Sequence, residues 1–414
     1  MYTLKPLTER AKRVRERYRN TEPKICIARY RLVTEFYQEH TQLRGILKRA
    51  CAMKHVFDHL PVRVEDDDVI VGALGTTFRS CAIYPEYSLG SLAREIANGN
   101  ISSRKYDPYL IDPEDGQYIM DTAEFWEKES MQAIMSEYTV DGFMPHNGSG
   151  TTTHGALFVS SGPVGHFCTG YNTAIRKGFG AIRDEAGEKM RRMEEDGIYG
   201  TDIDRYYFYK AVAIVCEGMI NFTKRYALKV EEMAEAETRP ERKAELLKMA
   251  DCLNHVTEKP ARTFIEALQG LFLYQICLSL EGNLHGMSWG RLDQYLGDFY
   301  ERDIAEGTVT PEYAQELLDL FYLKLAEMNK FWGDMGENGQ PGYTSGQLIT
   351  IGGVDPDTGE DATNEVTYMP AVLRTPGPAR SPAGAPRPQR DARQPVGSRH
   401  RDQPDLWRSA QFRE

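Results

Sequence analysis

The sequence lacks an apolar run that could span a membrane, and its N-terminus, MYTLKPLTERAKRVRERYR, lacks the apolar core of a signal peptide. A basic surplus is also missing, because 50 Lys and Arg stand against 61 Asp and Glu, for a formal net charge of -11. A protein that binds nucleic-acid phosphates needs such a surplus. The sequence therefore predicts a cytoplasmic protein with no membrane or nucleic-acid partner.

Paired cysteines are missing as well. No CxxC pair occurs, which argues against a zinc site or a redox motif. An odd number of cysteines in a long chain without a signal peptide fits reduced thiols, most of them small core residues. The seven scattered cysteines are Cys26, Cys51, Cys81, Cys168, Cys216, Cys252 and Cys277.

Two glycine-rich loops imitate ligand-binding motifs without completing them. Segment 141–171 contains GSGTTTHG but lacks the Lys that a GxxxxGK[ST] phosphate loop requires. Its three histidines, His146, His154 and His166, do not have the spacing of zinc ligands, so we expect no metal. Segment 352–365, GGVDPDTGEDATNE, begins like a calcium loop but lacks the Gly and Glu that an EF-hand needs. It predicts a tight turn that leads into a helix.

Apolar residues at three- and four-residue spacing predict helices along most of the chain. One of these segments is apolar nearly all round and should be buried. Another begins with Thr310 as N-cap and Pro311 in the first turn. Short apolar runs at 67–74 and 346–354 predict buried strands or extended segments. The predicted helices are 21–40, 43–60, 204–238, 240–256, 261–280 and 310–331.

The loop EGNLHGMSWGRLDQYLGDFYERD, residues 281–303, concentrates polar side chains where the most apolar helix ends. Polar groups at the mouth of a buried helix must bond to one another or to a ligand. The pattern therefore predicts either a structural network anchored by Arg291 and Asp293 or a binding site. The polar residues of this loop include Glu281, Asn283, His285, Ser288, Arg291 and Asp293.

Several long segments carry a resemblance to a known family. SWGRLDQYLGDFYERDIAEGTVTPEYAQELLDLFYLKL and IGGVDPDTGEDATNEVTYM resemble the pyruvate formate-lyase-like glycyl radical enzymes. The similarity is greatest to the branch with glycerol, propanediol and hydroxyproline dehydratases, choline lyase and isethionate lyase. ICIARYRLVTEFYQEH, DDDVIVGALGTTFRSCAIYPEYS and GHFCTGYNTAIRKGFGAI resemble that branch in the same order. The resemblance covers residues 5–369.

The resemblance implies a helix-rich α/β fold, the N-terminal portion of a ten-stranded α/β barrel wrapped by helices. It implies a radical dehydratase or lyase that cleaves C–O, C–N or C–S bonds of a small polar substrate, in a family that includes formate acetyltransferases. Such enzymes use a protein glycyl radical, which a radical-SAM iron-sulfur activating enzyme installs, and no bound cofactor is expected. The full-length members are expected to be homodimers.

The resemblance also implies three substrate-binding residues. His166 in GHFCTGY and His285 in EGNLHG match family histidines, and Asn283 is retained. The imidazoles of His166 and His285 would hold substrate hydroxyls or protonate a departing hydroxyl group. Gly286 stands where the glycerol dehydratases have Ser, which puts a diol substrate in doubt.

Two motifs of the family are absent from this sequence: the Gly-Cys-x-Glu finger loop and the Arg-Val-x-Gly-Tyr/Phe radical site. VCEG at Cys216 lies within a helical pattern and is expected to be structural. Residues 370–414 instead hold eight Pro and nine Arg, without Lys, Ile, Tyr, Cys or Met. We expect them to be an out-of-frame, disordered tail that follows a domain formed by residues 1–369.

These absences predict an inactive N-terminal fragment that contains no catalytic residue. Two alternatives remain open. The chain could be a binding module that pairs with a separately encoded C-terminal half. It could also derive from a glycyl radical enzyme of the arylacetate decarboxylase type.

Overall fold

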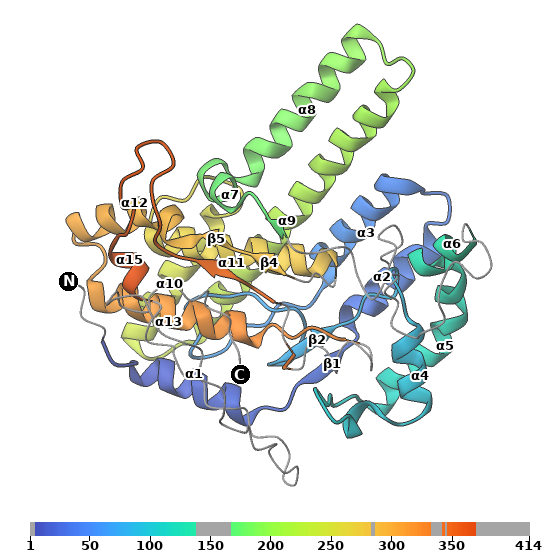
Figure 1. The fold of residues 1–414 in the computed structure, drawn as a ribbon, viewed down its shortest axis with the longest axis horizontal. Helices are drawn as coiled ribbons and strands as arrows, with labels where there is room; N and C mark the ends of the chain where they lie inside the picture. The colour runs from blue at the N-terminus through green and yellow to red at the C-terminus, as the bar shows by residue number, and fades with distance from the viewer. Residues whose placement is uncertain (1–4, 138–166, 283–285, 333–341, 344–345, 370–414) are drawn as a thin grey trace, which may run out of the picture.

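The computed structural model describes residues 5–137, 167–282, 286–332, 342–343 and 346–369 (Figure 1). The helices are α1 (Glu9–Asn20), α2 (Ala28–Glu39), α3 (Gly45–His59), α4 (Gly90–Ala97), η1 (Ile101–Ser103), α5 (Pro113–Glu129), α6 (Met131–Glu137), α7 (Tyr171–Lys177), α8 (Phe179–Asp196), α9 (Asp202–Ala236), α10 (Pro240–His255), α11 (Phe264–Glu281), α12 (Leu292–Ala305), α13 (Pro311–Glu327) and α15 (Glu365–Tyr368). The strands are β1 (Lys24–Cys26), β2 (Ser80–Ala82), β3 (Phe167–Cys168), β4 (Met287–Ser288), β5 (Gly290–Arg291) and β6 (Ile349–Thr350).

The strands form two parallel groups. In the first, β1 pairs with β2, with Ile25 opposite Cys81. On its other side β1 bridges to Leu110, whose carbonyl oxygen accepts a hydrogen bond of 2.8 Å from the Ile25 amide. Strand β1 is therefore central in this group. Parallel strands need long crossovers, and the helices between them supply these connections.

The second group is built around the segment 287–291. Strand β4 pairs with β3, and β5 pairs with β6, both in parallel. Only Trp289 separates β4 from β5, and its amide donates a 2.7 Å hydrogen bond to the carbonyl oxygen of Leu348, beside β6. One extended segment thus lies between β3 and β6, so residues more than 100 positions apart in the sequence become neighbours.

Helix α11 is the most deeply buried helix, as its composition predicts. Thr263 caps its N-terminus by accepting a hydrogen bond from the Glu266 amide. Phe264, Leu268 and Leu271 are among its fully buried residues. Helix α13 begins with Thr310 as N-cap, confirming the predicted start. Burial of these apolar side chains at about 25 cal/mol per Å² supplies the main stabilisation of the core.

Helices α8 and α9 form a long hairpin that extends away from the rest of the molecule (Figure 1). The later part of α9 packs against α3, where Gly218 allows close approach to Lys54 and Phe57. Cys216 is buried within α9, which confirms that VCEG is a helical segment. Five of the seven cysteines are buried, whereas Cys168 is exposed.

One local prediction differs from the structure, and another is met by the second of its two alternatives. Helix α2 begins at Ala28 rather than at the start of segment 21–40, because Lys24–Cys26 forms strand β1. The run around Val71 is buried and forms no strand, which agrees with the extended segment that was the other predicted form. The side-chain amide of Gln269 bonds both the amide and the carbonyl of Val71, at 2.8 Å each. Side-chain hydrogen bonds here replace a strand partner.

The calcium-like segment forms a turn, as predicted. Asp355 Oδ1 accepts hydrogen bonds of 2.9 Å from the amides of both Asp357 and Thr358. Helix α15 follows, and Asn364 and Thr367 form a reciprocal capping box at its start. The predicted tail, residues 370–414, lies outside the described residues. Among the helices that are described, none is both long and apolar enough to cross a membrane.

Candidate functional site

The three predicted substrate-binding residues, His166, Asn283 and His285, lie outside the described residues. The strands that follow them are described. Strand β3 begins at Phe167 and β4 at Met287, and these two residues are partners in the parallel register. The strands that directly follow the two predicted segments are therefore neighbours in one sheet.

A polar network beneath these strands fixes their position. Tyr171 donates a 2.5 Å hydrogen bond to Gln275 Oε1 in α11, and Gln275 Nε2 donates to Gln347 Oε1 at 2.9 Å. The indole of Trp289 also donates to Gln347 Oε1, at 3.3 Å, and stacks on the Tyr171 ring with centroids 4.7 Å apart. Each buried polar group has a partner, so this network holds β3, β4 and β6 in one arrangement.

Gly286, the residue just before β4, adopts a φ of +66°. Side chains other than glycine are strained in this region. Glycine is therefore suited to the backbone conformation at position 286, and a serine in this conformation would be strained.

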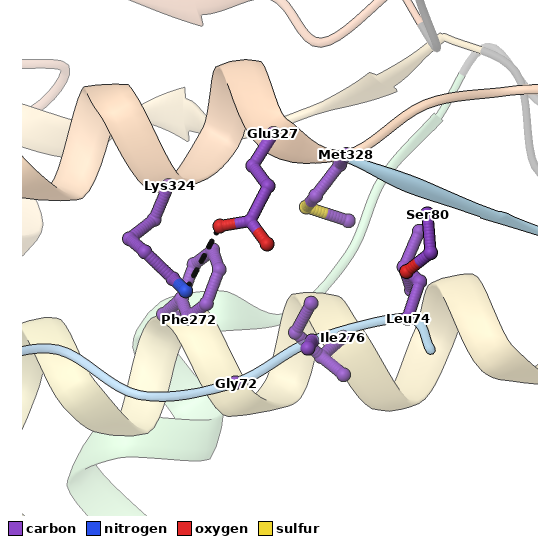
Figure 2. Close-up of a pocket in the computed structure, with 9 residues that line it drawn as sticks. Gly72, Leu74, Ser80, Phe272, Ile276, Lys324, Glu327 and Met328 are labelled. Atoms are coloured by element: carbon purple, nitrogen blue, oxygen red, sulfur yellow. Dashed lines mark ion pairs between the residues drawn. The ribbon is translucent and has the colours of Figure 1, made fainter. Parts of the chain in front are cut away.

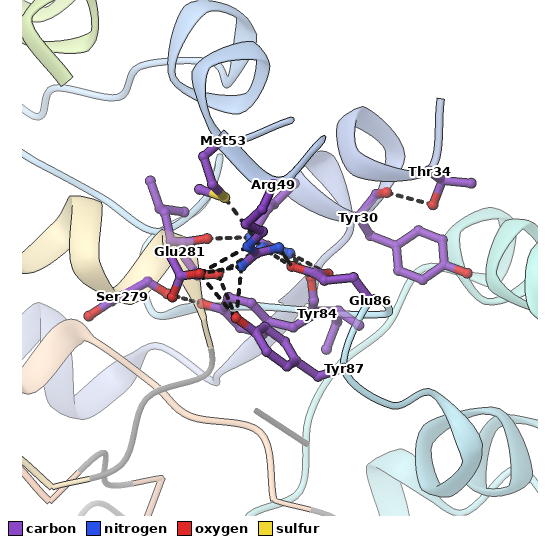
Figure 3. Close-up of polar contacts among 12 residues, drawn as sticks. Tyr30, Thr34, Arg49, Met53, Tyr84, Glu86, Tyr87, Ser279 and Glu281 are labelled. Carbon is purple, nitrogen blue, oxygen red and sulfur yellow. Dashed lines mark hydrogen bonds and ion pairs between the residues drawn. The ribbon is translucent and has the colours of Figure 1, made fainter. Parts of the chain in front are cut away.

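A second network holds the end of α11, directly before this loop (Figure 3). Arg29, fully buried, donates through Nε to the Leu280 carbonyl at 2.6 Å and forms a bidentate ion pair with Glu86. Arg49 bonds Glu86 Oε1 at 2.6 Å and Glu281 Oε1 at 2.9 Å. Helices α2 and α3 thus both hold the C-terminal end of α11.

The opposite charges of this network lie in direct contact, Glu86 with Arg29 and Arg49. Burial alone would raise the pKa of Glu86, but the positive charges and hydrogen bonds of Arg29 and Arg49 outweigh it and lower the pKa to about 2. Tyr87 adds a hydrogen bond of 3.1 Å from its hydroxyl to Glu281 Oε1. Glu86 therefore stays ionised at neutral pH, and the network anchors the C-terminal end of α11.

Arg291 and Asp293 form a third network, which confirms the structural interpretation of GRLDQYL. Asp293 Oδ2 accepts hydrogen bonds from the Gly352 amide at 2.7 Å and from the Thr367 hydroxyl at 2.5 Å. Arg291 donates to the carbonyls of Gly352 and Val354 at 2.9 and 2.7 Å. The two motifs that are most typical of the family, GRLDQYL and GEDATNEVTY, thus bind each other.

A narrow cavity of about 10 Å³ lies between α11, α13 and the extended chain after Gly72 (Figure 2). Lys324 Nζ is 3.0 Å from Glu327 Oε2 and 3.7 Å from Asp68 Oδ1. Burial lowers the pKa of Lys324 to about 8, although Asp68 opposes this shift. The cavity has room for about one water molecule, so it serves packing rather than substrate binding.

Sequence reasoning missed the Gln275–Gln347–Trp289 and Arg29–Glu86–Arg49 networks. Glutamine in the middle of the most apolar helix was a usable signal, because a buried amide needs partners. Arg29 and Glu86 gave no such signal, since they are 57 residues apart and lie in ordinary helical or loop context.

Comparison with known proteins identifies the family and the fold. The family model described as pyruvate formate lyase-like matches residues 6–375. The chain belongs to this family. Its parallel strands and surrounding helices are therefore part of the family's α/β barrel, and the resemblance inferred from the sequence is confirmed.

The relatives that match include sulfite-lyases and dehydratases. Isethionate sulfite-lyase from Nitratidesulfovibrio vulgaris is 31% identical over 376 residues, which cover 87% of this chain and 44% of the relative. (2S)-3-sulfopropanediol dehydratase from Klebsiella oxytoca is 29% identical and covers the same shares. The glycerol-bound B12-independent glycerol dehydratase from Clostridium butyricum superposes with a TM-score of 0.81 at 29% identity, over 89% of this chain and 45% of that structure. The chain thus spans less than half the length of these relatives.

Proposed function

We propose that this chain is the N-terminal part of a glycyl radical dehydratase or lyase that cleaves a C–O, C–N or C–S bond of a small polar substrate. The observation that carries the proposal is the parallel pairing of β3 with β4, together with membership of the family. That pairing joins the strands that follow His166 and His285, the two residues proposed to bind substrate.

The roles of the residues follow from their chemistry. In the family, the glycyl radical supplies hydrogen-atom abstraction through a cysteine thiyl. The imidazoles of His166 and His285 would hydrogen-bond the polar groups of the substrate, and one of them would give a proton to the leaving hydroxyl or amine. Asn283 would orient the substrate. The surrounding helices would exclude water, which protects a reactive radical from side reactions.

The proposal extends to the partners of the complete enzyme. We propose a cytoplasmic homodimer that is activated by a radical-SAM iron-sulfur enzyme, because the family's radical must be installed after folding. The finger-loop and radical-site motifs are absent from these 414 residues. We therefore propose that the radical and the thiyl reside in the part of the relatives' length that this chain does not match.

The test is a chimera of residues 1–369 with the C-terminal part of an isethionate sulfite-lyase, activated anaerobically by that enzyme's own activating partner. We expect a glycyl radical doublet in electron paramagnetic resonance and turnover of a small hydroxylated, aminated or sulfonated substrate. H166A and H285A should keep the doublet and lose turnover. Turnover that is unchanged in both variants would contradict the proposed binding roles.

A second measurement uses the 414-residue chain itself and does not depend on the chimera. After the same activation it should give no glycyl radical doublet. A doublet on this chain would show that a radical site exists among the present residues and would refute the assignment of the radical to the unmatched part.

A second candidate function is a binding module that pairs with a separate C-terminal half. The observation in its favour is Asp319, which is 1% exposed and whose Oδ2 has no hydrogen-bond partner. It lies beside Gln315, which bonds the carbonyl of Met369 at 2.9 Å, at the end of the last described helix. Co-purification of this chain with the C-terminal part of a relative, weakened by D319L, would support pairing; failure to co-purify would exclude it.

A further inference from the structure

Two histidines meet in the last turns of α3, far along the chain from the predicted substrate residues. His55 and His59 are four residues apart, so they lie on the same face of the helix. Their ring centroids are 4.3 Å apart, with an angle of 36° between the rings. His55 is half-buried and His59 is exposed, so the pair can be reached from solvent.

The hydrogen bond of the His59 ring fixes its proton position. His59 Nδ1 is 2.8 Å from the carbonyl oxygen of His55. Because a carbonyl only accepts, Nδ1 must carry the proton, and the lone pair of His59 is then on Nε2. Histidines that bind metals commonly donate their other ring N–H to a backbone carbonyl in this way, which orients the ring and raises its basicity.

Imidazole nitrogens are preferred ligands of Zn²⁺, Cu²⁺ and Ni²⁺. His55 and His59 place two such rings side by side, one helical turn apart, on the surface of α3.

We propose that His55 and His59 form a surface site for a divalent late first-row transition metal, with water completing the coordination. Among the residues that the structure describes, no group of three or more His, Cys, Asp or Glu is placed to bind a metal. The site therefore has two protein ligands and exchanges its metal readily. It is independent of the proposed radical chemistry.

A metal held at this site would act on the packing of α3. Arg225 and Asn221 of α9 bond the Phe57 carbonyl at 2.9 Å and the Asp58 carboxylate at 3.0 Å, between the two histidines in sequence. A metal ion bound by both histidines would link the two ends of one helical turn and so stabilise that turn. Metal binding should therefore stabilise the contact between α3 and α9 and raise the thermal midpoint.

The experiment uses the untagged 414-residue chain, stripped with a chelator and titrated at pH 7.5 by calorimetry with Cu²⁺, Ni²⁺, Co²⁺ and Mg²⁺ separately. Affinity should fall in the order Cu²⁺, Ni²⁺, Co²⁺, with no binding of Mg²⁺. Electron paramagnetic resonance of the Cu²⁺ form should show hyperfine coupling to two nitrogens. The increase in thermal midpoint on adding Ni²⁺ should accompany binding.

The variants separate the metal site from helix stability. H59Q keeps a side-chain amide that can donate to the His55 carbonyl but removes the strong ligand, so the affinity should fall at least about tenfold, or about 1.4 kcal/mol. H55A/H59A should remove one equivalent of bound metal and the two-nitrogen signal. H255A is the matched control, because His255 also lies in the last turn of a helix, α10, and bonds a carbonyl, that of Pro260, at 2.8 Å.

Binding that persists unchanged in H55A/H59A would overturn the proposal, because the metal would then sit on other histidines of the chain. An equal loss in H255A and H59Q would overturn it too, since the effect would then follow from helix stability. Circular dichroism shows whether the double variant H55A/H59A is folded. If it is unfolded, the metal affinity of H59Q decides the result.

Discussion

The Arg29–Glu86–Arg49 network gives a sharp test of what holds the first helices to α11. We predict that E86Q strongly destabilises the protein. Glutamine keeps the shape of the side chain but removes its charge. Arg29 is fully buried and would then keep only neutral partners, among them carbonyl oxygens, Met53 Sδ and the Tyr84 ring, so its charge would lose its nearest counterion.

The magnitude follows from the pKa of Glu86, which falls from 4.5 to about 2 in the folded protein. A shift of about 2.5 units corresponds to about 3 kcal/mol. Because the folded-state pKa is the lower one, this stabilisation is present above about pH 4.5 and is lost as the pH falls toward 2. Removal of one partner from a buried ion pair costs about 3–5 kcal/mol, which is the same range.

The assay is urea unfolding followed by circular dichroism, at pH 7 and at steps down to pH 3. E86Q should lower the free energy of unfolding by about 3 kcal/mol at pH 7 and lower the melting temperature by about 6 °C. The difference from the parent chain should shrink below pH 4.5. E124Q is the control, because Glu124 forms an exposed pair with Lys128 at 2.8 Å and should have almost no effect. If E86Q unfolded like E124Q, or if its effect did not depend on pH, the reasoning would be refuted.

Two further predictions concern single residues. Burial raises the pKa of Asp319 from 3.8 to about 7, so stability is lost as the pH rises from about 4 through 7. D319N should therefore stabilise the protein by about 4 kcal/mol at pH 8 and hardly at all at pH 4; an equal gain at both pH values in urea unfolding would contradict this. G290A should destabilise by about 1–3 kcal/mol, since Gly290 has a φ of +66° and a Cβ there would lie 2.7 Å from Cys168 Sγ. G187A, in exposed α8 with open space around it, should instead stabilise by about 1 kcal/mol, and thermal melts that failed to separate the two would count against the contact.

The helices could be predicted because their signals are local. Thr310 and Pro311 mark the start of α13, and the cap bond reaches only three residues along the chain, to Tyr313. The periodic apolar residues of α9 and α10 predict the ends of these helices to within a few residues. The strands could be predicted less well. Strands β1 and β2 have three residues each, which is too short for an alternating pattern, and their pairing joins positions 56 residues apart.

The sequence by itself determined the family, the helical composition and the local turn at Asp355. It also narrowed Arg291 and Asp293 to two roles, because buried polar groups must find partners. The tertiary structure decided which partners the buried polar groups have. Asp293 bonds Gly352 and Thr367, and Glu86 bonds Arg29 and Arg49. The physical reason is distance along the chain. A hydrogen bond between residues that are 50 to 250 positions apart leaves no periodic trace in sequence, and it forms only when the helices and parallel strands bring its two ends together.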